Sequence, residues 1–319
     1  MDDPTSILAA FDPTNTLGSL LIGGFIAVFL FGLSTVQTYL YYREYPKDHR
    51  PLKFMVAFVW ICELAHTICI TDSIYVAVIT FYGQPEKLVK LPPALNLTVA
   101  FGAPVTAAVQ MFYTDRIRRF IGRRIYIPIS LWFLSGIRMI GSYVLVVVSF
   151  KIPSVTEYVA DWGWMFTLLF TMGAFVDVAI AIALVANLYT HRKHVFSPTL
   201  KVLDRLIWWT IQTGLVTSII AVAVVICFQT MKSNLIWITI YTCLGKVYSN
   251  SFMAVLNARN SFRNDEAIYE VNVPTGMLFA NNSASSDTAQ GHEMGLDRLE
   301  DTDIGSVSLH SKSIERRVA

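Results

Sequence analysis

Long apolar stretches separated by short polar segments dominate the first 260 residues of the chain. A helix needs about 20 mostly apolar residues to cross the hydrocarbon core of a bilayer, which is about 30 Å thick. Seven stretches meet this requirement, with approximate limits 17–41, 54–81, 93–114, 125–149, 162–190, 206–230 and 235–257. The pattern predicts an all-α polytopic membrane protein, a bundle of seven transmembrane helices.

Basic residues are distributed unevenly between the two sides of this predicted bundle. The connections on one side hold thirteen of them: Arg43, Lys47, Arg50, Lys53, Arg116, Arg118, Arg119, Arg123, Arg124, Arg192, Lys193, Lys201 and Arg205. The connections on the other side hold four: Lys87, Lys90, Lys151 and Lys232. Because cytoplasmic loops carry the excess of Lys and Arg, we expect the thirteen in the cytoplasm. An odd number of spans then places the N-terminus outside and the C-terminus in the cytoplasm.

The two ends of the chain differ from the predicted helical domain at 17–260. Residues 1–16 contain no Lys or Arg, unlike the basic start of a signal peptide, and we expect them to form an extracellular N-terminal segment. Residues 261–319 are rich in small polar side chains and poor in aromatic ones, which predicts a disordered cytoplasmic tail. Its Ser and Thr residues could be phosphorylated, or the tail could be inert.

Composition agrees with a membrane location. Hydrophobic residues make up 54% of the chain and charged residues 15%, against about a quarter charged in soluble domains. We expect a multi-pass protein of the plasma membrane whose main contact is the lipid bilayer. A net charge of +2 gives no reason to expect nucleic acid as a partner. The four cysteines all lie within apolar stretches, so no extracellular disulfide is expected.

Ionisable residues near the middle of a span are costly and usually face the bundle interior, so each is a candidate site residue. Six form a candidate buried polar cluster: Glu63, His66, Asp72, Arg138, Asp177 and Lys246. Similar depth in the membrane would allow Glu63 to pair with Lys246, and Arg138 with Asp177. The cluster could line a ligand cavity, relay protons, or act as a structural network that keeps the helices in register.

The sequence gives little support for a metal site, a retinal pigment or an enzyme. Glu63 and His66 share a helix face, but one helix supplies poor tetrahedral geometry, so we expect no metal site. Lys246 lies where retinal proteins form a Schiff base, but the third stretch holds no carboxylate counterion and Thr242 stands one turn before the lysine. Hydrolase, phosphate-loop and zinc-protease motifs are absent from the sequence. We therefore expect no catalytic residues, no cofactor and no enzymatic activity.

Three parts of the chain carry a resemblance to a known family. They are QMFYTDRI at 110–117, LIWWTIQTGLVTS at 206–218, and KVYSNSF with LNAR at 246–252 and 256–259. Together they resemble an uncharacterised seven-span membrane family of basidiomycete fungi, which is defined by a domain of unknown function in its C-terminal half. The resemblance covers roughly residues 15–260. It implies a fungal source and seven spans, and it implies no activity.

Topology and the cytoplasmic helix ends favour a receptor-like or sensory protein. Asp115 and Arg116 close the third stretch, where G-protein-coupled receptors carry an acid–arginine pair. Asp204 and Arg205 precede the sixth stretch, so an ionic contact between the two helices is conceivable. A cytoplasmic signalling protein could then bind the basic loops and the tail. The alternatives are a transporter or a proton- or ion-conducting protein that uses the buried charges, and a membrane scaffold.

Overall fold

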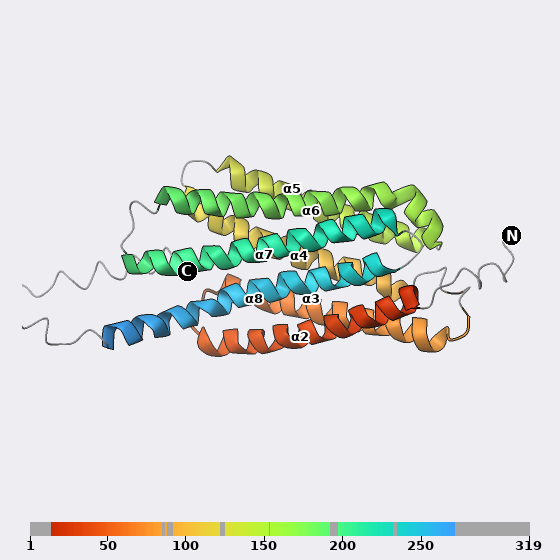
Figure 1. Ribbon diagram of the computed structural model, residues 1–319, viewed down its shortest axis with the longest axis horizontal. Coiled ribbons are helices and arrows are strands. Elements are labelled where there is room, and N and C mark those ends of the chain that lie inside the picture. Colours follow the sequence, from red (N-terminus) through yellow and green to blue (C-terminus); the bar gives the residue numbers. More distant parts are fainter. Residues whose placement is uncertain are drawn as a thin grey trace, which may run out of the picture.

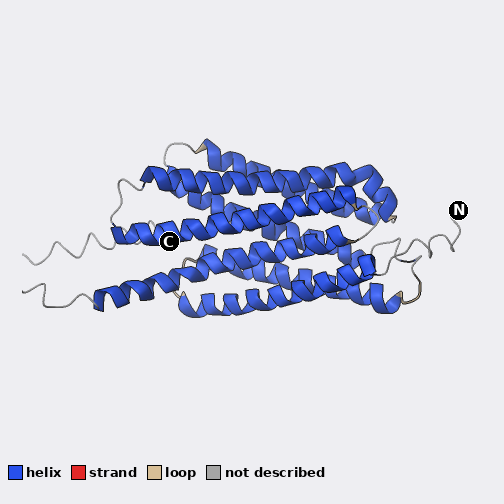
Figure 2. Ribbon diagram, in the orientation of Figure 1, coloured by secondary structure: helices blue, strands red, loops and turns tan. Residues whose placement is uncertain are grey.

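The computed structural model describes residues 14–271, with gaps at 85–86, 88–91, 122–124, 153, 192–196 and 232–234. Within this range, the side chains at some helix ends, chiefly those of 187–213 and 260–271, are outside the description. The described residues form helices joined by short loops and contain no strand (Figure 2). The all-α prediction is confirmed.

Each of the seven predicted stretches falls on one long helix. The α-helices are α2 (Ser19–Glu44), α3 (Arg50–Tyr75), α4 (Pro93–Ile121), α5 (Tyr126–Lys151), α6 (Val155–His191), α7 (Ser197–Thr230) and α8 (Ile236–Val271). Single π-helical turns precede α2, as η1 (Thr14–Gly18), and continue α3, as η2 (Val76–Thr80). Apolar residues in long unbroken runs form these helices because a helix satisfies all of its own backbone hydrogen bonds without water.

The helices lie side by side along the longest axis of the molecule (Figure 1). Short connections make consecutive helices run in opposite directions, so α2, α4, α6 and α8 begin at the same end. Helix α4 packs against α3, α5, α6 and α8 and therefore occupies the middle of the bundle. Helix α8 packs against both α2 and α7. The first halves of α4, α6 and α8 therefore lie at the same end of the bundle.

The outside of the bundle is apolar. Large side chains point away from the protein on several helices, among them Phe25 at 67% exposed, Ile182 at 63% and Ile219 at 67%. Soluble monomers rarely expose contiguous apolar patches beyond a few hundred Å². Such a surface suits the lipid tails of a bilayer, as expected for a multi-pass membrane protein.

Five described helical segments are long and apolar enough to cross a membrane: Thr16–Glu44, Arg50–Thr80, Pro93–Arg119, Tyr126–Lys151 and Glu157–Ala186. A shorter apolar segment, Gly214–Thr230, belongs to α7. The number of spans and their orientation stay predictions.

Several helices extend beyond the predicted spans. Helix α6 begins at Val155 rather than near 162, and α8 runs to Val271, past the predicted end of the helical domain at 260. The apolar pattern marks only the part of a helix that lipid would cover, and backbone hydrogen bonding carries the helix on into polar sequence. The predicted disorder of the tail concerns residues that lie mostly outside the description.

Close packing of α2 against α8 depends on Gly23. A Cβ atom at Gly23 would lie 2.6 Å from Thr239 Cγ2 and 3.2 Å from the Thr239 Cα, whereas a Cβ at Gly32 on the same helix would meet nothing within 4 Å. We expect Gly23→Ala to destabilise the protein by about 1–3 kcal/mol, the usual range for overpacking. Gly32→Ala should be neutral or slightly stabilising, because Ala favours a helix over Gly. Thermal unfolding of the purified full-length variants tests this. Equal melting temperatures for the two variants would contradict the proposed close contact.

Candidate functional site

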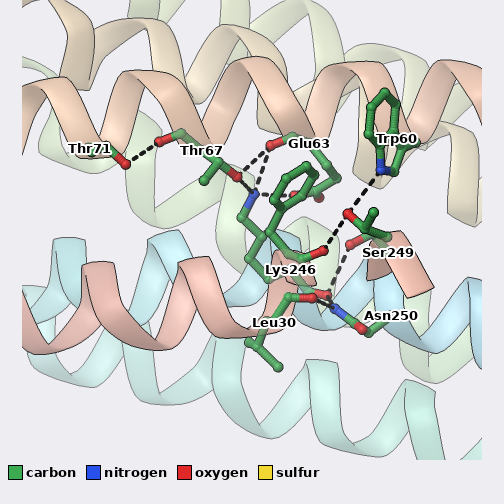
Figure 3. Close-up of polar contacts among 10 residues, drawn as sticks. Leu30, Trp60, Glu63, Thr67, Thr71, Lys246, Ser249 and Asn250 are labelled. Atoms are coloured by element: carbon green, nitrogen blue, oxygen red, sulfur yellow. Dashed lines mark hydrogen bonds and ion pairs between the residues drawn. The ribbon is translucent and has the colours of Figure 1, made fainter. Parts of the chain in front are cut away.

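A buried ion pair joins α3 to α8. The Lys246 side chain is fully buried, and its Nζ lies 2.5 Å from Glu63 Oε2. It also donates hydrogen bonds to Thr67 Oγ1 at 2.6 Å and to the Glu63 carbonyl at 3.0 Å (Figure 3). An ammonium group has three donors, of which two make these hydrogen bonds, while the Glu63 carboxylate beside it is the charged partner. Of the two ion pairs considered from the sequence, the one between Glu63 and Lys246 therefore forms.

The same region of α8 also holds α2. Asn250 Nδ2 donates to the Leu30 carbonyl at 3.0 Å, and Asn257 Nδ2 donates to the Gln37 carbonyl at 2.8 Å. Lys246 Nζ lies 5.2 Å from the centroid of the Phe31 ring, a cation–π distance. Hydrogen bonds between helices take over part of the role that water-driven apolar burial plays in soluble proteins. Helices α2, α3 and α8 therefore form one fixed unit.

Asp177 on α6 is the centre of a second polar network. The side chain is buried, and its carboxylate accepts hydrogen bonds from Gln110 Nε2 at 2.9 Å, from Thr217 Oγ1 at 3.0 Å and from the Tyr248 hydroxyl. Gln110 Oε1 in turn accepts from Ser135 Oγ at 3.0 Å. These five residues come from five different helices, α4 to α8. We call them the Asp177 network.

The second ion pair considered from the sequence, between Arg138 and Asp177, does not form. The guanidinium lies instead against Gly173, where an added Cβ would be 2.8 Å from Arg138 Nε. Gly173 and Asp177 are four residues apart and share a face of α6, so Arg138 crosses α6 one turn nearer its start. Asp177 is meanwhile occupied by neutral donors. Among the described residues, Arg138 has no hydrogen bond through its side chain and no ion pair.

A cavity of about 80 Å³ opens next to Arg138. It lies at the end where α4, α6 and α8 begin, and side chains of α3, α4, α5, α6 and α8 line it. The lining is mostly apolar and aromatic, with a few polar groups: His66, Asn96, Thr98, Thr106, Arg138, Ser142, Ser149, Tyr158 and Tyr241. The His66 side chain is 3% exposed, and its Nδ1 has no hydrogen-bond partner among the described residues. A cavity of this volume with several polar groups in its wall can hold several waters or a small ligand.

Asp72 does not belong to the buried cluster. The structure places it on the exposed side of α3, although the sequence analysis grouped it with the buried charges. The prediction was wrong because depth along a helix says nothing about which face a side chain occupies. The other five members are within the bundle, in three separate places rather than one cluster: the Glu63–Lys246 pair, the Asp177 network, and the cavity with Arg138 and His66.

The predicted coupling residues are partly described. Asp115 forms ion pairs with Arg118 at 2.7 Å and with Arg119 at 2.9 Å, both on its own helix. Arg116 takes no part in these pairs and is half-buried. The side chains of Asp204 and Arg205 lie outside the described residues, so the contact considered between α4 and α7 stays a prediction.

Sequence reasoning missed the neutral members of the Asp177 network. Gln110, Thr217 and Tyr248 supply all three donors to the carboxylate, yet only ionisable residues were selected as candidates. The available signal was the presence of a hydrogen-bonding side chain within an otherwise apolar stretch. That signal is weak, because Ser and Thr commonly bond to their own helix backbone, as Thr71 does to the Thr67 carbonyl here.

Comparison with known proteins places one domain on the chain. Residues 173–261 match a family described as "Family of unknown function (DUF6534)". The match lies in the C-terminal half and includes Asp177, Thr217, Lys246 and Tyr248. A search of curated proteins gives no match. The description of this family names no activity.

The buried ion pair gives a direct test of the α3–α8 contact. We expect Lys246→Met and Glu63→Gln each to destabilise the protein by about 3–5 kcal/mol, because each leaves one buried charge without its partner. The double variant should lose less than the sum of the two single losses, because it leaves neither charge. Lys151→Met, at an exposed position, serves as the control. Chemical denaturation of the four variants measures these changes, and additive losses would show that the two residues do not interact.

The Asp177 network predicts a graded series. Asp177→Ala leaves the Gln110 amide and the Tyr248 hydroxyl without this acceptor, whereas Thr217 can still donate to the Gly214 carbonyl at 3.0 Å. We therefore expect a loss of at least about 2 kcal/mol, given about 1–3 kcal/mol for each unsatisfied group. Tyr248→Phe removes one donor and should cost about 1 kcal/mol. Asp161→Ala changes an exposed acid on the same helix and should be silent. Unfolding curves rank the variants, and an Asp177→Ala protein as stable as Asp161→Ala would rule out a structural role for the network.

Proposed function

We propose that this chain is a receptor-like or sensory seven-helix protein of a fungal plasma membrane, with its N-terminus outside and its C-terminus in the cytoplasm. The observation that carries the proposal is the position of the cavity relative to the Asp177 network. The cavity is at the end of the bundle that the basic loops assign to the outside, and the network lies deeper. Arg138 lines the cavity, and its charge is near enough to act on Asp177. A ligand in the cavity would therefore change the electrostatic environment of the Asp177 network, which joins helices α4 to α8.

The seven long helices and the distribution of basic residues support the topology. All seven predicted stretches fall on helices, and those of the thirteen basic residues that the structure describes lie at or near helix ends on one side of the bundle. Arg118 and Arg119 at the end of α4 are about half-exposed there. Resemblance to the basidiomycete seven-span family supports the fungal source and the span count.

At the end that the proposed topology places in the cytoplasm, an ion pair and a cation–π contact join the loop between α2 and α3 to α8. Asp48, in the loop between α2 and α3, pairs with Arg259 of α8 at 2.5 Å, and the Arg259 guanidinium lies 4.3 Å from the Tyr45 ring centroid. This contact holds the loop against Arg259, well before α8 ends at Val271. A cytoplasmic signalling protein would meet a defined basic surface rather than a loose loop.

One observation favours a transporter or proton conductor as a second candidate. Asp177 is a buried acid without a basic partner among the described residues, and a small cavity of about 20 Å³ lies beside it. An acid in this setting could carry a proton or hold a small cation. The sensory proposal is preferred because the larger cavity lies at one end of the bundle, whereas transport requires access from both ends.

Nucleotide-sensitive capture of a fungal Gα subunit tests the sensory proposal. We expect full-length protein in membranes to retain Gα and GTPγS to release it. Arg116→Ala should weaken capture several-fold, because Arg116 is half-buried at the cytoplasmic end of α4 and takes the place of the arginine in the receptors' acid–arginine pair. The matched control is Arg118→Ala on the same helix, which should retain capture, because Arg118 is held at the periphery by Asp115.

Absence of Gα capture by a folded protein at the cell surface would contradict coupling to a G protein. Flux measurements would then separate the second candidate. Loss of substrate or proton flux in Asp177→Asn, at unchanged surface expression, would favour transport.

A further inference from the structure

We propose that the cavity beside Arg138 binds a small amphiphilic carboxylate, with the carboxylate on Arg138 and an apolar body against the aromatic wall. This inference rests on the proposed function, since it names the ligand class of the sensory cavity.

The lack of an ion-pair partner for Arg138 among the described residues favours an anion as the ligand. A guanidinium stays protonated under all ordinary conditions, and a cation in the membrane interior is costly unless something neutralises it. Glu63 is paired with Lys246, and Asp177 accepts hydrogen bonds from neutral donors. No described carboxylate lies within ion-pair distance of Arg138. A bound anion would supply the missing partner.

The position of Arg138 suits a carboxylate in particular. Its guanidinium lies against α6, in space that a side chain at Gly173 would fill. The planar fork of an Arg matches the two oxygens of a carboxylate and can donate two parallel hydrogen bonds. The absence of a side chain at Gly173 therefore leaves the space that the guanidinium occupies beside the cavity.

His66 also lines the cavity, and one of its ring nitrogens makes no hydrogen bond to the described residues. It comes from α3, on the other side of α4 from Arg138, and is almost fully buried. Its Nδ1 has no partner among the described residues, although a buried polar atom normally has one. Its Nε2 and the Tyr241 hydroxyl both border the space beside Gly102, each within 3.7 Å of a Cβ added there. A polar substituent of the ligand, or a water that it retains, would satisfy His66.

The rest of the wall selects an apolar body. Phe166, Phe170, Trp237 and Tyr241 line the cavity and pack on one another, with ring centroids 4.5 Å apart for Phe166 and Phe170 and 5.0 Å for Phe166 and Trp237. Aromatic faces favour aromatic or compact aliphatic groups. A ligand with one charged end and one ring-sized apolar end uses both parts of the cavity.

The experiment compares benzoate with benzamide, which have the same ring but differ in charge. Purified full-length protein in nanodiscs of neutral lipid is titrated with each, and the melting temperature and Trp fluorescence are followed, since Trp237 lines the cavity. We expect benzoate to bind saturably and at least tenfold more tightly than benzamide. Arg138→Gln should weaken benzoate binding at least tenfold, and Arg138→Lys less. Lys151→Gln, an exposed cation on the same helix, should leave benzoate binding unchanged.

A second variant guards against loss of folding. Gly173→Ala keeps the charge of Arg138 but displaces the guanidinium, so it should weaken benzoate binding if the position of the fork matters. Equal affinity for benzoate and benzamide, unchanged binding in Arg138→Gln, or no binding of benzoate or hexanoate would each overturn the proposal. Stabilisation by anionic lipid in the nanodisc and not by benzoate would also overturn it, in favour of a lipid headgroup. The assay does not involve Gα, so carboxylate binding and G-protein coupling can fail independently.

Discussion

A polar side chain inside a helix bundle in lipid has no water to bond with, and its partners must come from neighbouring helices. Asp177 shows how far this constraint organises the protein. A single carboxylate collects donors from α4, α7 and α8, and through Gln110 it also reaches Ser135 on α5. Rotation of any one of these helices would separate a donor from its acceptor. The relative positions of five helices therefore depend on one buried acid, while Glu63 and Lys246 fix α3 against α8.

The Asp177 network and the Glu63–Lys246 pair distinguish two regions of the bundle, one in which polar groups are satisfied and one in which some are not. Deeper in the bundle, Glu63 pairs with Lys246 and Asp177 accepts three hydrogen bonds, so the helices are held in register there. Around the cavity, the wall is aromatic, His66 has an unused nitrogen and Arg138 has no ion pair among the described residues. A ligand would complete contacts in the second region and disturb those in the first through the charge of Arg138. That arrangement gives the sensory proposal a physical route from the cavity to the Asp177 network.

Much of the fold could be predicted from the sequence, because the length of an apolar run is a direct consequence of bilayer thickness. Depth along the helix also brought Glu63 and Lys246 together correctly. Depth alone failed for Asp72 and for Arg138 with Asp177, because contact also depends on how each helix is rotated about its axis. Hydrophobic periodicity usually reports that rotation, but it is weak here, since both the lipid-facing and the buried faces are apolar. Gln110, Thr217 and Tyr248 were missed for a related reason: a neutral polar residue in a span has no cost large enough to mark it as a site.

The state of Arg138 follows from the partners that the other buried charges have taken. Glu63 pairs with Lys246, and Asp177 accepts hydrogen bonds from three neutral donors, so neither acid forms an ion pair with Arg138. Had Asp177 paired with Arg138, as its depth suggested, the cavity would be lined by a neutral pair and would have no preference for charge. Neutral donors at Asp177 leave the positive charge of Arg138 on the cavity instead. Specificity for an anion would then arise from hydrogen bonds made deeper in the bundle, by residues that do not touch the ligand.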